Sequence, residues 1–438
     1  MAQQNYGTFP SVDVEFDRDG KLVDPASIGR LTAMVENAAI TDLFVMSHGW
    51  NNNMTEARAL YDTVFKSVAT QLDDPKNAGI RDRVFGVMAV LWPSKRFTDE
   101  SAIPGGAASA GDARGDQLRQ GLSELQDAFP ERAADLDEAK KLIDSLESNE
   151  RAQDRFVEIL AAVMQPPSQT DVGMDSVPSA MKTRKGDVLR SLQGPVGVRK
   201  PRSFDGGGAA EVGTHGGAAD LGGFFRSIKD AALGALNVTT YFTMKERAGK
   251  IGEALAPLLD KLRGSAKTPR LHLVGHSFGA RLVTSAANHA QQPVATLSLL
   301  QAAYSHYGFA KSFDGTAGHD GFFRNVVAQH KVSGPIIITH SVQDKAVGLA
   351  YPIASRIGGQ IAAALGDAND PFGGMGRNGA QKTPEVPNVN AALLPVGADY
   401  TLANGVPNNL QGDTIITSHG DIGKPAVTYA VLRSIART

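Results

Sequence analysis

The chain has 438 residues, with 44 Lys and Arg against 46 Asp and Glu, so its formal net charge is −2 at pH 7. This near-neutral balance gives no electrostatic reason to expect nucleic acid as a partner. The sequence has no cysteine, which excludes disulfides and thiolate metal sites. No apolar run approaches the ~18–20 residues of a membrane span, and the N-terminus lacks the pattern of a signal peptide, so we expect a cytoplasmic protein.

The N-terminal part alternates predicted strands with predicted helices. Residues 12–17 alternate apolar and acidic side chains, which is typical of an edge strand, and Asp19-Gly20 supplies a turn. The following elements are a helix over 27–38, an apolar strand over 43–48, a helix over 56–72 and an apolar strand over 85–92. This alternation predicts an α/β fold, with a mainly parallel sheet flanked by helices.

The chain changes character between Trp92 and about residue 237. Residues 113–164 are charged and helical with a modest apolar stripe, whereas Pro and Gly accumulate over about 165–223, which we expect to be partly flexible. We therefore assign 1–93 and 237–438 to a core and 94–236 to an insertion. Because it follows a core strand, the insertion is predicted to form a cap or lid over a site. A surface excursion with no role in binding is the alternative.

The C-terminal part carries a second series of elements. A helix-like pattern covers 224–242, and a helix is predicted over 246–262. Apolar strands are predicted over 271–275, 294–300 and 334–341, and a last one over 413–418 with a histidine at its end. These strands would continue the parallel sheet.

Residues 271–279, Leu-His-Leu-Val-Gly-His-Ser-Phe-Gly, are the most informative stretch of the sequence. An apolar strand runs into Gly-x-Ser-x-Gly, and a helix is predicted directly afterwards over 280–287, which is the context of a nucleophile elbow. At such a turn Ser277 would be strained, with its hydroxyl lifted clear of the sheet. Gly275 and Gly279 would be needed because the helix crosses the strand closely. The alternative is a tight turn with an incidental serine.

A serine nucleophile needs a base to take its proton and an acid to orient that base. Asp344 and His419 each follow a predicted strand, and with Ser277 they lie in the chain order serine, acid, histidine. Two other acids compete for the orienting role. Asp399 lacks a clear preceding strand, and Asp421 is too close in sequence to His419 to face its imidazole easily. The order and strand-end positions favour Ser277, Asp344 and His419.

An upstream strand supplies a candidate oxyanion hole. The predicted strand over 43–48 ends in His48-Gly49-Trp50. A tetrahedral intermediate needs backbone N–H donors aimed at its oxygen, and losing one donor typically costs ~3–4 kcal/mol. We expect the two donors to be the amide of Phe278, directly after the serine, and the amide of Trp50.

On these motifs the chain resembles the α/β-hydrolase superfamily, of the serine esterase and lipase type, over about 40–95 and 235–438. The run His-Gly-Trp departs from the His-Gly-Gly-Gly form and is similar to that of lipases in which one glycine precedes a bulky residue. The resemblance implies a serine carboxylester hydrolase that acts on small-molecule or acyl-chain esters without a cofactor. An amidase, a thioesterase, an acyltransferase and a catalytically silent binding scaffold are the alternatives.

Several aromatic and histidine residues are candidates for substrate contact. They are His48, Trp92, Phe97, Phe224, Phe225, Tyr241 and His276. For His48, His276 and His340, which lie at strand ends, a structural role is favoured over catalysis, and His272 is expected to be a core histidine with satisfied hydrogen bonds. No two histidines show the i, i+4 spacing with an acid that would indicate a metal site.

Residues 374–379, Gly-Met-Gly-Arg-Asn-Gly, formally match a dinucleotide-binding pattern. That pattern binds a pyrophosphate only where it follows a strand and opens a helix. Here it follows Asp-Pro-Phe-Gly, and Thr383-Pro384 would end any helix almost at once. The segment is therefore predicted to be a loop.

Overall fold

The computed structural model describes residues 4–50, 52–94, 113–164, 176–192, 227–264, 268–344, 357 and 373–438. The chain divides into two compact units. The first comprises Met1–Lys95, Met244–Gly348 and Gly374–Thr438, and the second comprises Arg96–Thr243 and Leu349–Gly373. The chain therefore leaves the first unit twice, once after the fourth strand and once after the seventh.

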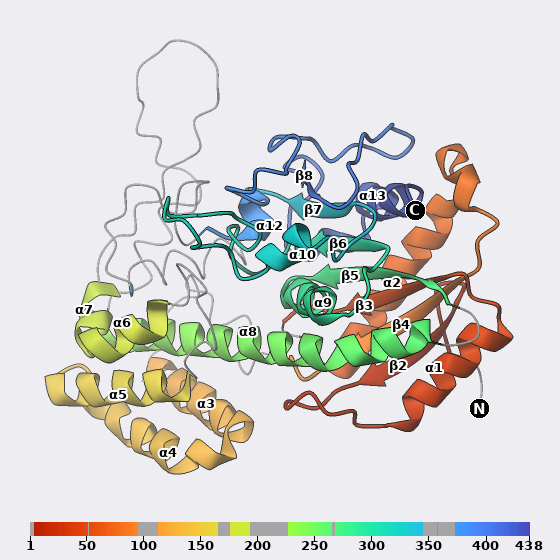
Figure 1. Cartoon of the computed structure of the whole chain (residues 1–438). Coiled ribbons are helices and arrows are strands. Elements are labelled where there is room, and N and C mark those ends of the chain that lie inside the picture. The colour runs from red at the N-terminus through yellow and green to blue at the C-terminus, as the bar shows by residue number, and fades with distance from the viewer. Residues whose placement is uncertain are drawn as a thin grey trace, which may run out of the picture. The chain divides into compact units, whose positions relative to one another are not determined.

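The first unit is built on a sheet that has eight strands among the described residues (Figure 1). These are β1 (Gln4–Tyr6), β2 (Phe9–Glu15), β3 (Asp42–Ser47), β4 (Phe85–Leu91), β5 (Arg270–His276), β6 (Thr296–Leu300), β7 (Ile336–His340) and β8 (Pro407–Gln411). Their spatial order is β1-β2-β4-β3-β5-β6-β7-β8. Only β1 and β2 pair antiparallel, and the other neighbours are parallel. The α/β class predicted from the alternation is confirmed.

Helices cover both faces of this sheet (Figure 1). Those with residues in the first unit are α1 (Ala26–Asn37), α2 (Met54–Leu72), α8 (Ile228–Arg263), α9 (Phe278–His289), α10 (Arg324–Ala328), α12 (Met375–Asn378) and α13 (Pro425–Ile435), with the short 3-10 turns η1 (Pro75–Ile80) and η6 (Asp421–Gly423). Helices α2 and α13 pack together on one face, and α1 and α9 lie on the other. Strands β3 and β4, covered on both sides, are buried along their whole length.

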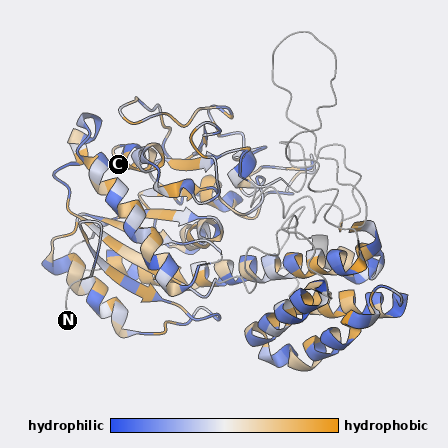
Figure 2. Cartoon of the chain, turned by 180° about the vertical axis from the view of Figure 1, so that it is seen from behind, coloured by the Kyte–Doolittle hydropathy of each residue, from blue (hydrophilic) through white to orange (hydrophobic). Residues whose placement is uncertain are grey.

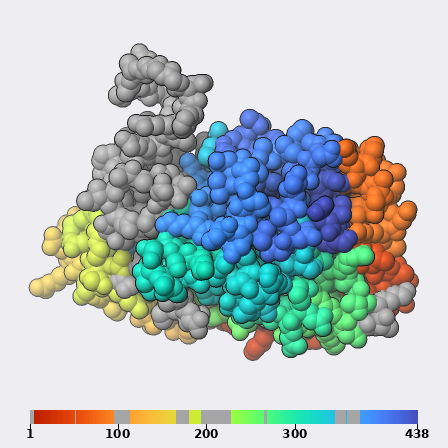
Figure 3. Space-filling model, turned by 45° about the horizontal axis from the view of Figure 1, so that its top comes forward, coloured from red at the N-terminus to blue at the C-terminus, as the bar shows by residue number. Residues whose placement is uncertain are grey.

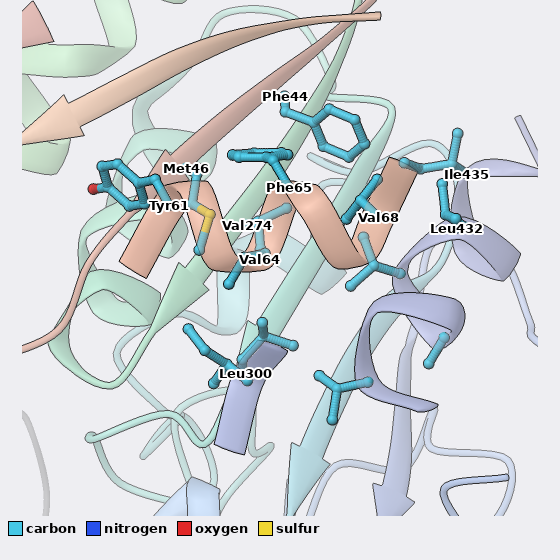
Figure 4. Packing of buried hydrophobic residues seen from close by; sticks show 14 of the residues in the cluster. Phe44, Met46, Tyr61, Val64, Phe65, Val68, Val274, Leu300, Leu432 and Ile435 are labelled. Atoms are coloured by element: carbon cyan, nitrogen blue, oxygen red, sulfur yellow. The ribbon is translucent and has the colours of Figure 1, made fainter. Parts of the chain in front are cut away.

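The core between the sheet and helices α2 and α13 is rich in aromatic rings (Figure 4). Phe44 of β3 lies 5.3 Å from Phe65 of α2 and 5.4 Å from Phe85 of β4, measured between ring centroids. Each such pair adds ~0.5–1.5 kcal/mol beyond the area it buries. Leu432 and Ile435 of α13 complete this side, and much of the strand surface behind α2 is hydrophobic (Figure 2). The core thus fixes the sheet whose ends carry the candidate site.

Two elements, one near the N-terminus and one in the middle of the chain, differ from the sequence prediction. The strand expected at the edge over 12–17 is β2 (Phe9–Glu15), and it lies second, because β1 (Gln4–Tyr6) pairs on its outer side. A three-residue polar strand gives no periodicity to detect. The helix-like pattern over 224–242 and the helix predicted over 246–262 form one continuous helix, α8, which contains Pro257.

The last predicted strand, over 413–418, was placed wrongly. The strand is β8 (Pro407–Gln411), and Ile416 instead lies in a turn, where its N–H donates to the Gly412 carbonyl. The side chain of Ile416 packs into the core, so its apolar character does not indicate a strand. Strand β8 contains polar residues that are buried. Its Asn409 can be buried because its side-chain amide bonds both the N–H and the carbonyl of Ala380.

The described part of the second unit is helical. It contains α3 (Ala113–Ala128), α4 (Ala133–Leu142), α5 (Glu150–Val163), α6 (Ser176–Arg184), α7 (Asp187–Leu192), the first part of α8 and the 3-10 turns η3 (Pro130–Arg132) and η4 (Ile143–Ser145). The helical pattern over 113–164 is confirmed. Helices α6 and α7 fall in the Pro- and Gly-rich stretch where no helix was expected, and the rest of that stretch lies outside the described residues. That the insertion is a cap stays a prediction.

Two loops of the first unit lie side by side, one teal and the other blue in Figure 3. One follows β6, over 301–323, and the other precedes β8, over 379–406. The N–H of Gln381 donates to the His306 carbonyl over 2.8 Å, and the ammonium of Lys382 lies 4.8 Å from the centre of the Tyr307 ring. These contacts join the two loops to each other.

We expect Gly252→Ala, in α8, to destabilise the protein by ~1–3 kcal/mol, because overpacking a tight contact forces the backbone to shift. A Cβ at Gly252 would lie 2.2 Å from the Leu282 carbonyl oxygen, where α8 crosses α9. Gly29→Ala in α1 is the matched control, since nothing lies within 4 Å of its Cβ position. The control should stabilise by ~0.5–1 kcal/mol, the usual gain for Gly→Ala in a helix. Urea unfolding measures both, and equal effects would contradict the close helix crossing.

Candidate active site

Ser277 lies between β5 and α9, as the sequence predicts. Its φ is +56° and its ψ is −121°, a conformation that residues with a side chain rarely adopt. Such strain costs ~1–3 kcal/mol and persists only where the surroundings hold it. Here the Ser277 N–H donates to the Leu300 carbonyl, and the Ser277 carbonyl accepts from the Ala303 N–H, both over 3.1 Å. The backbone of the serine is therefore fixed from the neighbouring strand β6.

Three glycines make the strained turn sterically possible. A Cβ at Gly275 would lie 2.4 Å from the Gly279 carbonyl oxygen, and one at Gly279 would lie 2.2 Å from the carbonyl oxygen of Ser47. A Cβ at Gly49 would lie 2.6 Å from the Cβ of Ser277 itself. These distances are far below any real contact, so each position accepts only glycine. The end of β3 therefore packs directly against the serine turn.

Asp344 and His419 form the hydrogen-bonded pair that the sequence analysis expects. The Nδ1 of His419 lies 2.8 Å from Oδ2 of Asp344. The Asp344 carboxylate is fully buried just beyond β7, and the His419 side chain is 22% exposed on the loop after β8. Because an ionised carboxylate only accepts, Nδ1 carries the hydrogen, and Nε2 is left as the nitrogen that can take a proton.

The loop that carries His419 is joined to the serine turn. The Nε2 of His276 lies 2.9 Å from the His419 carbonyl oxygen, and the centres of the two imidazole rings are 4.7 Å apart. Ser277 and His419 are both among the described residues, and the Ser277 hydroxyl makes no hydrogen bond to the His419 imidazole. Such bonds often tighten only when a substrate is present. The contacts place the serine and the histidine in one site.

The two competing acids lie elsewhere. Asp399 is exposed and paired with Lys76 over 2.7 Å. Asp421 accepts hydrogen bonds from the N–H groups of Thr417 and Ser418, in the loop just before His419. Burial raises the pKa of Asp421, but hydrogen bonds from Lys424, Thr417 and Ser418 outweigh it and hold the pKa well below its usual range. Asp421 therefore shapes the loop, whereas Asp344 is the acid that contacts the imidazole.

The two expected oxyanion donors flank Ser277. Phe278 is the first residue of α9, and backbone N–H groups of a first helical turn point out of the helix end. Trp50 follows Gly49, whose Cα abuts the serine. The rings of Trp50 and Phe278 pack edge to face, 5.8 Å apart, and Asn52 donates to the Trp50 carbonyl over 3.2 Å. The loop after β3 is thus fastened beside the serine turn.

His48 and Trp92 bond to each other in the interior, and contact of either residue with a substrate stays a prediction. Both side chains are fully buried. The Trp92 N–H donates to Nε2 of His48, and the Trp92 indole N–H donates to the His48 carbonyl. Nδ1 of His48 must then carry the hydrogen, and it lies 2.9 Å from the Gly49 carbonyl. Burial lowers the pKa of His48 to about 4, so the ring stays neutral and fastens the loop after β3.

The other candidates have separate outcomes. His276 contacts the His419 loop and not open solvent, and the buried Tyr241 packs on Phe242 within the second unit. Phe97, Phe224 and Phe225 lie outside the described residues. His272 is confirmed as a buried core histidine whose ring nitrogens contact Asp42 and Thr296, each over 3.0 Å.

The loop that carries Asp344 is held by residues that the sequence analysis missed. Arg377 of α12 donates to the Val342 carbonyl over 2.6 Å, and Asp413 accepts the Val342 N–H over 2.9 Å. Together they clamp the loop that carries Asp344. The glycine run over 374–379 was the signal in the sequence for a close backbone contact at this place. A Cβ at Gly376 would lie 2.5 Å from the backbone carbon of Gln301. Gly376 serves this close packing, and the segment predicted to be a loop contains the one-turn helix α12.

Comparison of the chain with protein-family models, with curated proteins and with solved structures gives no match. Within the described ranges, no group of three or more His, Asp or Glu side chains is arranged to hold a metal ion. None of the described helices has an apolar stretch long enough to cross a bilayer. The chemistry of the site therefore has to be inferred from the chain's own residues.

Buried neutral histidines should make the free energy of unfolding depend on pH. Burial lowers the pKa of His48 and His340 to about 4 and that of His276 to about 3. The unfolded chain titrates near 6.5. Below pH ~6.5 the unfolded chain binds more protons, so stability is complete above that value and falls as the pH is lowered, by up to ~1.4 kcal/mol per pH unit for each such histidine.

His340→Asn isolates one of these groups. The Nδ1 of His340 lies 3.3 Å from the Arg377 carbonyl, and the amide of asparagine can keep that hydrogen bond without titrating. Urea unfolding between about pH 5 and pH 7 should show a smaller pH dependence for this variant. The same change at the exposed His330 is the matched control. A slope equal to that of the wild type would mean that His340 binds a proton in the folded protein as readily as in the unfolded chain.

Proposed function

We propose that this chain is a serine hydrolase of the α/β-hydrolase fold that cleaves carboxylic esters through an acyl-enzyme. The observation that carries the proposal is the conformation of Ser277, a non-glycine residue with φ of +56° at a turn where only glycine fits on either side. A structural serine has no need of such strain. A nucleophile does, because the strain presents the hydroxyl at the end of the sheet.

The positions of the partners support the same fold and chemistry. The serine follows β5, the acid follows β7 and the histidine follows β8, so they keep the order of α/β-hydrolases. In that fold one oxyanion donor is the amide after the nucleophile and the other lies in the loop after the third strand. Phe278 and Trp50 occupy these places, since Trp50 lies between β3 and α2.

In the proposed acylation, Oγ of Ser277 attacks the acyl carbon while its proton passes to Nε2 of His419. Asp344 keeps the hydrogen of the imidazole on Nδ1 and stabilises the imidazolium that forms. The carbonyl oxygen becomes an oxyanion, which accepts hydrogen bonds from the amides of Phe278 and Trp50. When the ester C–O bond breaks, His419 returns its proton to the leaving alkoxide.

Deacylation repeats these steps with water. His419 takes a proton from the water as its oxygen attacks the acyl carbon, and the same two amides hold the second oxyanion. The proton then returns to Oγ of Ser277, which releases a carboxylic acid. The ester and one water supply every atom of the alcohol and the acid that are released, and the enzyme returns to its starting state.

We predict that Ser277→Ala and His419→Ala each lower kcat/KM for p-nitrophenyl butyrate by at least ~10³-fold, because nucleophile and base act as one unit. Asp344→Asn should lose somewhat less. Asp399→Asn is the matched control and should stay near wild type, because Asp399 is exposed and contacts Lys76. If Ser277→Ala kept more than a few per cent of the activity, with contamination excluded, Ser277 would not be the nucleophile.

Comparison of the butyrate ester with the matching anilide and thioester identifies the bond that is cleaved. Preference for the ester supports the proposal. Preference for the anilide or the thioester would change the bond that the enzyme is proposed to cleave and would keep the roles of the same three residues. No turnover of any of them, together with no reaction with an active-site probe, would favour a binding scaffold.

A further inference from the structure

The carbonyl oxygen of His419 accepts two hydrogen bonds from buried side chains. His276 donates through Nε2 over 2.9 Å, and Gln301 donates through Nε2 over 3.5 Å. His276 is the residue directly before Ser277, and Gln301 directly follows β6. One carbonyl thereby accepts hydrogen bonds from the last residue of β5 and from the residue directly after β6. The backbone of the base is thus held independently of its contact with Asp344.

The Gln301 side chain is itself oriented. The Thr339 hydroxyl donates to Oε1 of Gln301 over 2.8 Å, which turns the amide so that its N–H₂ group faces His419. Gln301 has a φ of +43°, unusual for a residue with a side chain, and Gln301 and Thr339 are both fully buried. Such a strained, buried residue persists only where its surroundings over-determine it. A side chain that served only to fill space would need neither the strain nor the hydroxyl partner.

His276 is suited to donate and not to react. Since a carbonyl only accepts, its Nε2 carries the hydrogen, and in the neutral ring Nδ1 has none. Burial, followed by the nearby His419, lowers the pKa of His276 to about 3. A neutral ring is needed at this place, because a second positive charge with its ring centre 4.7 Å away would oppose the imidazolium that forms on His419 during the reaction.

We propose that His276 and Gln301 are positioning residues that hold the His419 carbonyl and so set the distance between the imidazole and the Ser277 hydroxyl. This inference rests on the proposed function, in which His419 is the base. His276 and Ser277 are adjacent, so the elbow that presents the nucleophile also anchors the base. A misplacement of ~1 Å can cost ~100-fold in rate, which is why two donors on one carbonyl would matter.

His276→Leu and His276→Gln form the matched pair that tests this. Leucine fills a similar volume without a donor, whereas the Nε2 of glutamine reaches about the same place as that of histidine. His276→Leu should lower kcat for p-nitrophenyl butyrate by ~10–100-fold with little change in KM, because the reacting groups are misplaced while substrate binding is kept. His276→Gln should recover most of the loss. A role in packing alone would leave both variants equally affected.

Gln301→Met and Thr339→Val give a second, independent test, which stands if His276→Leu does not fold. Gln301→Met removes the other donor and should also lower kcat with KM kept. Thr339→Val releases the Gln301 side-chain amide and the 3.3 Å bond from the Gln301 N–H to the hydroxyl, but leaves the amide in place, and should have a smaller effect in the same direction. A change in KM without one in kcat, or no change in either variant, would overturn the positioning role.

The outcome for the wild type separates the two proposals. If the wild-type protein hydrolyses the ester and the His276 and Gln301 variants keep its kcat, the positioning role is wrong and the hydrolase stands. If the wild-type protein does not hydrolyse the ester and does not react with a fluorophosphonate, the proposed function is wrong and this inference fails with it.

Discussion

The candidate site depends on how closely three backbone segments meet at the end of β5. The turn over 275–279, the last residues of β3 and the loop at Gly49 approach until no Cβ can be accommodated at three positions. Such contact is possible only with glycine at these three positions, and Ser277, which lies among them, has a positive φ. The hydrogen bonds from β6 then keep it there. The position of the serine is therefore a property of the sheet and not of a mobile loop.

Buried histidines act as neutral connectors around this turn. His48 joins the loop after β3 to β4 through Trp92, His276 joins the serine turn to the loop of His419, and His340 joins the end of β7 to α12. His48 donates through one ring nitrogen and accepts through the other, which a charged imidazolium cannot do. Burial keeps all three uncharged. None of the three therefore competes with the proposed base for a proton.

Apolar periodicity predicts the central strands and the serine turn, because these are buried and built from local sequence. It fails at β8, whose Asn409 is buried only because Ala380, distant in sequence, satisfies its amide. His419 was nevertheless found from the order of the motif, although it lies on a loop and not at a strand end. Gln301 and Arg377 could not be found, since their roles depend on contacts between loops that are far apart in the chain.

The most direct test of the proposed nucleophile is the site of covalent reaction with a fluorophosphonate, read by peptide mass mapping of the whole protein. The probe phosphonylates an activated serine and requires no knowledge of the natural substrate. We expect one adduct, on Ser277 in the tryptic peptide over 271–281, and its loss in His419→Ala. No adduct, or an adduct on another serine, would contradict the assignment of Ser277 as the nucleophile.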